Sequence, residues 1–497
     1  MFKDILKGTG IYSITVVAER VASFLLLPVY TRFLMPADYG LLELLDLTVY
    51  ILTALVGMRI AESLYYYHSR ADDPESQKRV VCTVLLGAVA MGAIGSALAS
   101  LAAPWISQGV FGTRRYVPLF YLLYTTFAFS LPLQVGLAYV RTIDRPKLYV
   151  AISVGRLILT AALNVVFLAV YGMGAPSILW SSLVVTSLTT PLLLLYVLKG
   201  IRPRQHFEWA LLKDFLRYSS PLGLGSLSLF VINFGDRFFL RTVVSLADLG
   251  IYALAYKMGM LVVNVQTPFD TYWKAQMFRI VRQPRGEAVY VGVSTYVTLG
   301  LTYIVLLLAL FTKPVIHLLV APAFYPAAIF VPWIAAAYVL RSLGVYFSSA
   351  FLLEGKTVQH TCVTAASAAA CLAAYAALIP RFQLWGAVAG TLVGFGVMVV
   401  LALWQAQKLR PFPYEFRRLA HLAVLAALVA AIFTAIQPAS LWAHCGLAVV
   451  VAGAYPLLLL RTKFFRADEL LFAEQLLTAL KRRISYAGWR AGEGISG

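Results

Sequence analysis

Charged side chains are scarce in this chain. Only 13% of its 497 residues are Asp, Glu, Lys or Arg, against roughly 25% in soluble domains, and 61% are hydrophobic. The stretches between the apolar runs are too short to hold a separate soluble domain. This composition excludes an ordinary soluble protein and predicts an all-α polytopic membrane protein.

Cysteine and catalytic motifs are also sparse. The cysteines lie in apolar runs without paired C-x-x-C spacing or nearby histidines, so we interpret them as small core residues. They are Cys82, Cys362, Cys371 and Cys445. The sequence shows no nucleophile–base arrangement, glycine-rich phosphate loop or metal-ligand cluster. We therefore expect a non-enzyme without a resident cofactor or metal.

Fourteen apolar runs are long enough to cross a bilayer, which takes about 20 helical residues for about 30 Å of hydrocarbon. The first contains Glu19 and Arg20 and lacks a small-residue cleavage site, so we expect a membrane helix and not a signal peptide. The predicted spans are 9–34, 39–66, 80–103, 116–140, 148–171, 175–198, 219–243, 248–272, 288–311, 326–352, 358–380, 384–407, 419–437 and 441–460.

The charge that is present is mostly positive, with 41 Lys and Arg against 22 Asp and Glu. Most of the basic residues fall in loops on one side, and the densest loops are Lys199–Arg217, Lys274–Arg285 and Lys408–Arg418. Positive loops face the cytoplasm, so both termini are predicted to be cytoplasmic. Topology and anionic lipid headgroups explain this excess, and nucleic acid is not an expected partner.

A weak internal repeat relates the two groups of six spans. The segment 36–40 (PADYG) resembles 246–250 (LADLG), and the same offset of 210 residues superimposes the predicted spans. Six helices per repeat give both copies the same direction, with an axis along the membrane normal and a site near the midplane. We predict lobes at 1–210 and 211–410, two extra helices at 411–462 and a cytoplasmic tail at 463–497.

Each copy of the repeat carries an acidic residue followed by glycine. Asp38 and Asp248 are placed to cap the helices that start there, because a carboxylate satisfies the free N–H groups of a first turn. Gly40 and Gly250 would allow close packing at these turns. Capping is the favoured interpretation, and direct substrate contact is the alternative.

Six basic residues lie inside the predicted spans, where a cation is costly unless it faces water, an anion or an acidic partner. They are Arg20, Arg59, Arg156, Arg237, Lys257 and Arg341. Arg59 lies one turn from Glu62, so a local pair is expected. Arg237 follows Asp236 in sequence. The two residues could neutralise each other, or Arg237 could contact the substrate, and the sequence favours neither interpretation. Lys257 and Arg341 lack an acidic residue within a turn in sequence.

The candidate binding residues follow from these positions. We predict a cationic cavity that binds an anionic substrate through Arg20, Arg156, Arg237, Lys257, Arg341, Asn233 and Asn264. Arg guanidinium groups bind phosphate oxygens in a fork geometry, whereas Lys acts as a point charge. A membrane carboxylate can exchange a proton or hold sodium, so Glu19, Glu43 and Asp46 are candidates for ion coupling.

Two segments resemble a known family. The run 27–34 (LPVYTRFL) with 35–40 (MPADYG) resembles the first-helix signature of polysaccharide flippases, which belong to the multidrug, oligosaccharidyl-lipid and polysaccharide exporter superfamily. The run 379–382 (IPRF) followed by 384–387 (LWGA) resembles the Ile-Pro turn and helix start of the same family. Together with the span count and repeat, the resemblance covers nearly the whole chain.

The resemblance implies two six-helix lobes around a central cavity, with alternating access. The implied substrate is a polyprenyl-pyrophosphate-linked oligosaccharide, moved from the cytoplasmic to the outer leaflet of the bacterial inner membrane, as in Wzx-type O-antigen and exopolysaccharide flippases. Membrane lipids, a polysaccharide polymerase and a chain-length regulator are the further partners it implies.

Three other functions remain open at this point. A lipid II flippase shares the cationic cavity, and a multidrug exporter of the same superfamily would need mainly acidic cavity residues. A membrane polysaccharide polymerase or glycosyltransferase would place catalytic groups in long outer loops, and the outer loops here are short. In the tail, apolar residues from Leu470 to Ile484 recur at helical spacing, which predicts an amphipathic helix on the membrane surface or against a partner helix.

Overall fold

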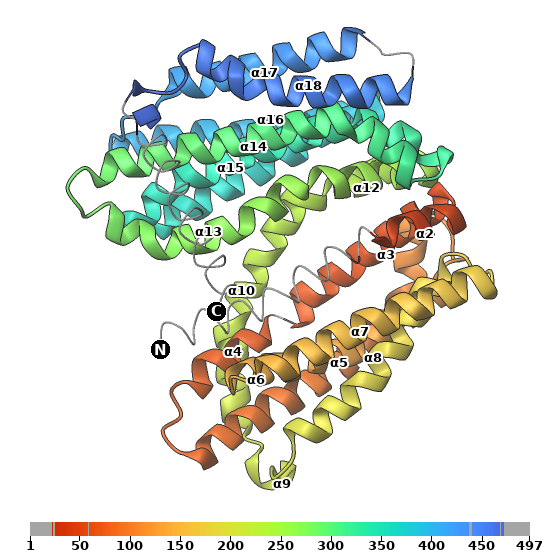
Figure 1. Ribbon diagram of the computed structural model, residues 1–497. Helices are drawn as coiled ribbons and strands as arrows, with labels where there is room; N and C mark the ends of the chain where they lie inside the picture. The colour runs from red at the N-terminus through yellow and green to blue at the C-terminus, as the bar shows by residue number, and fades with distance from the viewer. Residues whose placement is uncertain (1–21, 23–24, 58, 437–439, 468, 472–497) are drawn as a thin grey trace, which may run out of the picture. The chain divides into compact units, whose positions relative to one another are not determined.

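The computed structural model describes residues 22, 25–57, 59–436, 440–467 and 469–471. Within these residues the regular secondary structure is entirely helical (Figure 1), which confirms the predicted fold class. Most of the first predicted span, 9–34, and most of the predicted tail helix lie outside the described residues.

The chain forms two compact units that are not continuous in sequence. The first comprises Met1–Thr267 and Val315–Pro411, and the second comprises Pro268–Pro314 and Phe412–Gly497. The lobes expected from the repeat were defined by sequence similarity and not by packing. Their boundaries therefore stay a prediction.

The first unit holds most of the helices. In its first half they are α2 (Leu27–Phe33), α3 (Pro36–Leu52), the π-helical turn η1 (Thr53–Gly57), α4 (Ile60–His68), α5 (Pro74–Phe111), α6 (Val117–Thr142), α7 (Pro146–Val165), the π-helical turn η2 (Val166–Val170) and α8 (Pro176–Val197). They continue with α9 (Pro203–His206), α10 (Trp209–Phe234), α11 (Asp236–Val243), α12 (Leu246–Gly259), the start of α13 (Leu261–Ile280), the 3₁₀ segment η3 (Pro322–Ile329), α15 (Val331–Leu353) and α16 (Thr357–Leu409).

The second unit is built around the part of α14 (Gly286–Leu319) that ends at Pro314, together with α17 (Phe416–Ile436) and α18 (Leu441–Arg461). Leu310, Leu422 and Tyr455 belong to one buried apolar cluster that joins the three helices. The ring of Tyr303 stacks on that of Tyr455 with centroids 5.9 Å apart. This unit contains the two extra helices that the sequence placed outside the repeat.

Eleven helices in the described residues are long and apolar enough to cross a membrane. The sequence predicted fourteen spans, and three differences account for the smaller number in the structure. The first span is largely outside the described residues. The seventh is divided at Gly235 into α10 and α11 and does not appear among the eleven. The eleventh and twelfth are joined in α16.

Helix α16 is a tight hairpin of two membrane-length halves. Its 53 residues would extend about 80 Å if straight, far beyond a bilayer core. Gln383 interrupts it with φ 50° and ψ −123°, and the halves then pack on each other. The Ser367 hydroxyl donates to the Gly394 carbonyl at 2.8 Å, and the Tyr375 and Thr391 hydroxyls lie 3.0 Å apart. The turn predicted at 379–387 is therefore confirmed.

The predicted capping by the repeated acidic residues is also confirmed, although each lies inside the first turn. The Met35 N–H donates to Asp38 Oδ2 at 3.0 Å, while Ser245 provides the cap of α12 and its N–H donates to Asp248 Oδ2 at 3.4 Å. Both are capping boxes in which a side chain reaches back to the residue before the helix. In both copies of the repeat the aspartate thus accepts the N–H of the residue before its helix, and Ser245 adds a side-chain cap in the second copy alone.

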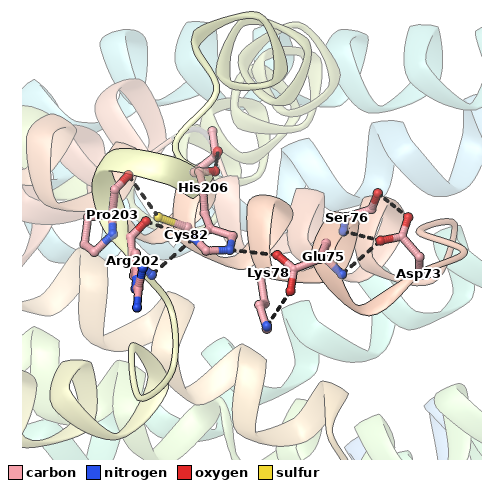
Figure 2. A network of polar contacts seen from close by, with 9 residues as sticks. Asp73, Glu75, Ser76, Lys78, Cys82, Arg202, Pro203 and His206 are labelled. Carbon is pink, nitrogen blue, oxygen red and sulfur yellow. Dashed lines mark hydrogen bonds and ion pairs between the residues drawn. The ribbon is translucent and has the colours of Figure 1, made fainter.

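The segment between α8 and α10 is fastened to the start of α5 (Figure 2). His206 is buried, and its Nε2 lies 3.0 Å from Glu75 Oε2, while its Nδ1 lies 2.9 Å from the Arg202 carbonyl oxygen. Next to it, the Glu208 N–H donates to the Thr83 hydroxyl at 3.0 Å. The connection between the two groups of predicted spans is therefore held in place along α5.

Candidate functional site

The candidate site lies along α3 and α12, which pack side by side in the first unit (Figure 1). Their closest approach is at Gly40 and Gly250. A β-carbon added to Gly40 would overlap the carbonyl oxygen of Leu246, and one added to Gly250 would overlap that of Pro36. Only glycine permits this approach of two helix backbones, so the predicted close packing is confirmed.

A buried arginine joins α3 to α11. Arg237 is 1% exposed, its Nη1 donates to Asp236 Oδ1 at 2.7 Å, and its Nε donates to Glu43 Oε1 at 3.1 Å. The same Nη1 donates to the Asn233 carbonyl at 2.9 Å. The pairing of Asp236 with Arg237 is thus observed, and Glu43 adds a second carboxylate that the sequence did not indicate.

Aromatic rings enclose this arginine. The Arg237 guanidinium carbon lies 3.8 Å from the centroid of the Tyr256 ring and 5.5 Å from that of Tyr252. The Tyr252 hydroxyl donates to Asp236 Oδ2 at 2.6 Å. Ion pairs, hydrogen bonds and cation–π contacts together compensate the removal of the guanidinium from water. The Nε and Nη1 groups of Arg237 therefore already have hydrogen-bond partners within the protein.

Asp46 and Lys257 present their side chains differently. Both are exposed, although each lies in a helix long and apolar enough to cross a membrane. The charge of Lys257 acts on both Asp46 and Glu43. Charged groups at this depth face water-filled space in preference to lipid. Beyond the glycine contact, α3 and α12 thus carry a carboxylate and an ammonium group that interact electrostatically.

Arg341 and Tyr338 bring α15 to this region. The Tyr338 hydroxyl lies 3.4 Å from Asn233 Oδ1, and its ring packs on Tyr256 with centroids 5.8 Å apart. Arg341 lies one turn further along α15, is half-buried, and its charge acts on Tyr338. It makes no ion pair or hydrogen bond within the described part of the chain.

The remaining predicted residues lie on other helices or outside the described residues. Arg156 is half-buried on α7, and Asn264 is half-buried on α13. Arg20 and Glu19 lie outside the described residues. Arg59 pairs with Glu62 at 2.9 Å on an exposed surface, as predicted. Substrate contact by Arg20, Arg156, Lys257, Arg341 and Asn264 stays a prediction.

The described cluster is balanced in charge. Glu43, Asp46 and Asp236 are opposed by Arg237, Lys257 and Arg341. Arg237 is neutralised by Glu43 and Asp236, whereas Lys257 and Arg341 make no hydrogen bond or close ion pair within the described residues. The arrangement can bind and position charged groups.

Sequence reasoning missed Tyr252 and Phe234, which complete the surroundings of Arg237. A signal existed for Tyr252, because it precedes Tyr256 by four residues and therefore shares its helix face. Phe234 gave none, because one more aromatic residue in an apolar run is unremarkable.

Comparison with known families now adds to this geometry. A family profile described as "Polysaccharide biosynthesis protein" matches residues 5–271, more than half of the chain. The match includes α3, α11 and α12, and thus the glycine contact and the arginine cluster. No curated protein sequence matches the chain.

Solved structures share the fold over most of their length. The lipid II flippase MurJ in an inward closed conformation has a TM-score of 0.68 at 10% identity, covering 91% of this chain and 99% of MurJ. An inward-facing multidrug resistance MATE family transporter of the MOP superfamily has a TM-score of 0.62 at 15% identity, covering 83% and 95%. A MOP superfamily transporter from Pyrococcus furiosus has a TM-score of 0.54 at 15% identity, covering 84% and 94%.

Proposed function

Because the chain belongs to the polysaccharide biosynthesis protein family, we propose that it is a flippase for a lipid-linked oligosaccharide used in surface polysaccharide synthesis. The substrate would be a polyprenyl-pyrophosphate-linked repeat unit, moved from the cytoplasmic to the outer leaflet of the bacterial inner membrane by alternating access. Both termini would be cytoplasmic, as the distribution of basic loops predicts.

The observation that carries this proposal is the position of Lys257 and Arg341 in membrane-length helices of a polysaccharide-synthesis protein with the MOP superfamily fold. Neither makes a hydrogen bond or a close ion pair within the described residues. A pyrophosphate offers several anionic oxygens, and two cations on neighbouring helices are suited to hold it while it crosses the apolar layer. Binding without bond breaking is all that the arrangement requires.

The coupling step of the proposal uses Asp46. Its carboxylate is exposed within a membrane-length helix. Lys257 interacts electrostatically with both Asp46 and Glu43. Protonation or sodium binding at Asp46 would change the charge that faces Lys257 and thereby the affinity for an anion. Arrival of substrate and release of the coupling ion would then be linked.

The test uses a strain that lacks the gene, complemented with wild type, Arg341→Ala or Arg341→Lys. The matched control is Lys408→Ala, which removes a cation that stacks on Trp404 at the end of α16. Oligosaccharide-lipid should accumulate in the inner leaflet with Arg341→Ala, and Arg341→Lys should restore part of the surface polymer. Normal surface polymer in the deletion strain, with the substrate lipid fully exposed outside, would overturn the proposal.

A further inference from the structure

A second feature of the first unit is an apolar groove of about 560 Å³ between η1, α5 and α10. Leu55 of η1 and Ile94 and Leu98 of α5 line it, and their side chains are 47%, 60% and 62% exposed. Leu216, Arg217 and Ser220 of α10 complete the wall. The groove is separate from the arginine cluster, and nothing in the proposed function uses it so far.

The polar groups of the groove come from one turn of α10. Arg217 and Ser220 are three residues apart and share a helix face, whereas η1 and α5 contribute only apolar surface. Arg217 is exposed and makes no hydrogen bond or ion pair with any described residue. A wall that is cationic on one helix and apolar on the others fits a molecule with an anionic head and a hydrocarbon chain.

The depth of the groove fits the same kind of molecule. Arg217 ends the basic loop that the sequence places at the cytoplasmic surface, whereas Ile94 and Leu98 lie within the predicted span 80–103. Helices α5 and α10 are close at Gly87, where an added β-carbon would meet the Leu212 side chain. From this crossing the groove continues along α5 to Ile94 and Leu98, which lie in the half of the predicted span farther from the cytoplasmic surface.

The backbone beside the groove is not regular α-helix. Between α3 and α4 the chain forms the π-helical turn η1, and Arg59 follows with φ 55°. Single π-helical turns within longer helices often mark functional sites. Here the turn places Leu55 and Val56 in the groove wall, opposite α5.

We propose that this groove holds the first part of the hydrocarbon chain of the lipid-linked substrate, with Arg217 against a phosphate of its head. This inference rests on the proposed function and adds a docking position for the substrate's chain on η1, α5 and α10. A polyprenyl chain is too long for the groove, so its remainder lies in the bilayer. Apolar burial holds the chain, and the guanidinium fixes the head at the entrance.

Photo-labelling of the full-length protein in phosphatidylcholine nanodiscs tests the groove directly. The probe is a polyprenyl pyrophosphate with a photoreactive group near the head end of its chain, and labelled residues are identified by mass spectrometry. Label is expected at Leu55, Ile94 or Leu98. It should fall about tenfold in Leu98→Trp, which fills the groove, and about tenfold in Arg217→Gln, which removes a charge-assisted hydrogen bond.

The matched controls are Leu101→Trp and Lys213→Gln, which change exposed residues of the same helices outside the groove wall. Both should leave labelling unchanged. Unlabelled polyprenyl phosphate should compete, whereas phosphatidic acid and inorganic pyrophosphate should not. Equal competition by phosphatidic acid would overturn the assignment, because an ordinary phospholipid would then occupy the groove. Label elsewhere on the protein would overturn it as well.

Flipping is measured separately, with lipid-linked oligosaccharide in proteoliposomes. If the wild type flips its substrate and Leu98→Trp flips it equally well, the groove proposal fails and the proposed function stands. If the wild type labels in the groove but transports nothing, the proposed function fails while the binding site stands. Specific labelling together with slower flipping by Leu98→Trp supports both.

Discussion

Gly40 and Gly250 face each other across the contact between α3 and α12, and each lies against a carbonyl oxygen from the start of the other helix. The relationship is reciprocal, because Pro36 and Leu246 occupy equivalent positions in the repeat. Two short sequence matches that were weak evidence alone thus prove to be the two halves of one packing contact.

Substitution at this contact is predicted to destabilise the protein. Gly40→Ala and Gly250→Ala each insert a methyl group against backbone that cannot move as a side chain would, and we expect a loss of about 1–3 kcal/mol. Thermal unfolding in detergent measures it. Gly155→Ala on α7 is the control, because an added β-carbon there meets nothing within 4 Å. Equal unfolding midpoints for all three variants would contradict this account.

Removal of the buried arginine is predicted to cost more. Arg237→Met leaves Asp236 and Glu43 without their cation in a buried setting, for which about 3–5 kcal/mol is expected. The yield of folded protein and its unfolding midpoint are the measurements. Arg59→Ala removes an exposed pair with Glu62 and should cost at most about 1 kcal/mol. A stable Arg237→Met protein that no longer binds substrate would instead assign Arg237 to substrate contact.

Asp46→Asn is predicted to uncouple transport from an ion gradient. The amide cannot ionise, so the side chain facing Lys257 keeps one charge state under all conditions. Flipping by the wild type in proteoliposomes should respond to a proton or a sodium gradient, and flipping by Asp46→Asn should proceed at one rate with or without it. Asp214→Asn, an exposed change on α10, should behave as wild type. An unchanged gradient response in Asp46→Asn would remove Asp46 from the coupling step.

In the second unit, lowering the pH is predicted to break the contact between Glu469 and Arg418 of α17. Burial opposes ionisation of Glu469, but hydrogen bonds from the Arg466 N–H and the Arg418 guanidinium outweigh it and lower the pKa of this carboxyl. A lowered folded-state pKa means that the stabilisation is complete above the ordinary value of 4.5 and is lost as pH falls through the lower value.

Glu469→Gln tests this pH dependence. At neutral pH the variant should weaken the local contact by about 1–2 kcal/mol, seen as faster hydrogen exchange at residues 415–422. The difference from wild type should disappear at a pH below the folded-state pKa, where the native side chain is protonated too. Asp72→Asn, an exposed change in the first unit, is the control. A difference that persists in acid would show that the ion pair is not its cause.

The fold was largely predictable because the length of the hydrophobic runs dominates the architecture of a membrane protein. The turn in α16 was foreseen from the segment around Pro380, and the capping role of Asp38 and Asp248 followed from helix chemistry. The break at Gly235 was not foreseen, because the apolar run continues across it and the residues on both sides favour helix.

The site was less predictable, since charge partners come from distant parts of the chain. Glu43 and Arg237 are 194 residues apart, and only the contact of α3 with α12 and its neighbours brings them together. The sequence could identify six costly cations but could not say which were already neutralised. Only the structure distinguishes Arg237, which acidic residues neutralise, from Lys257 and Arg341.

The fastened segment around His206 has a consequence for how the chain assembles. Exchange of identical halves between two copies requires the connection between those halves to open and extend. Here the connection is held against α5 by Glu75 and Thr83, so extension would break several polar contacts at once. An exchange of halves between two copies would therefore have to break these contacts first.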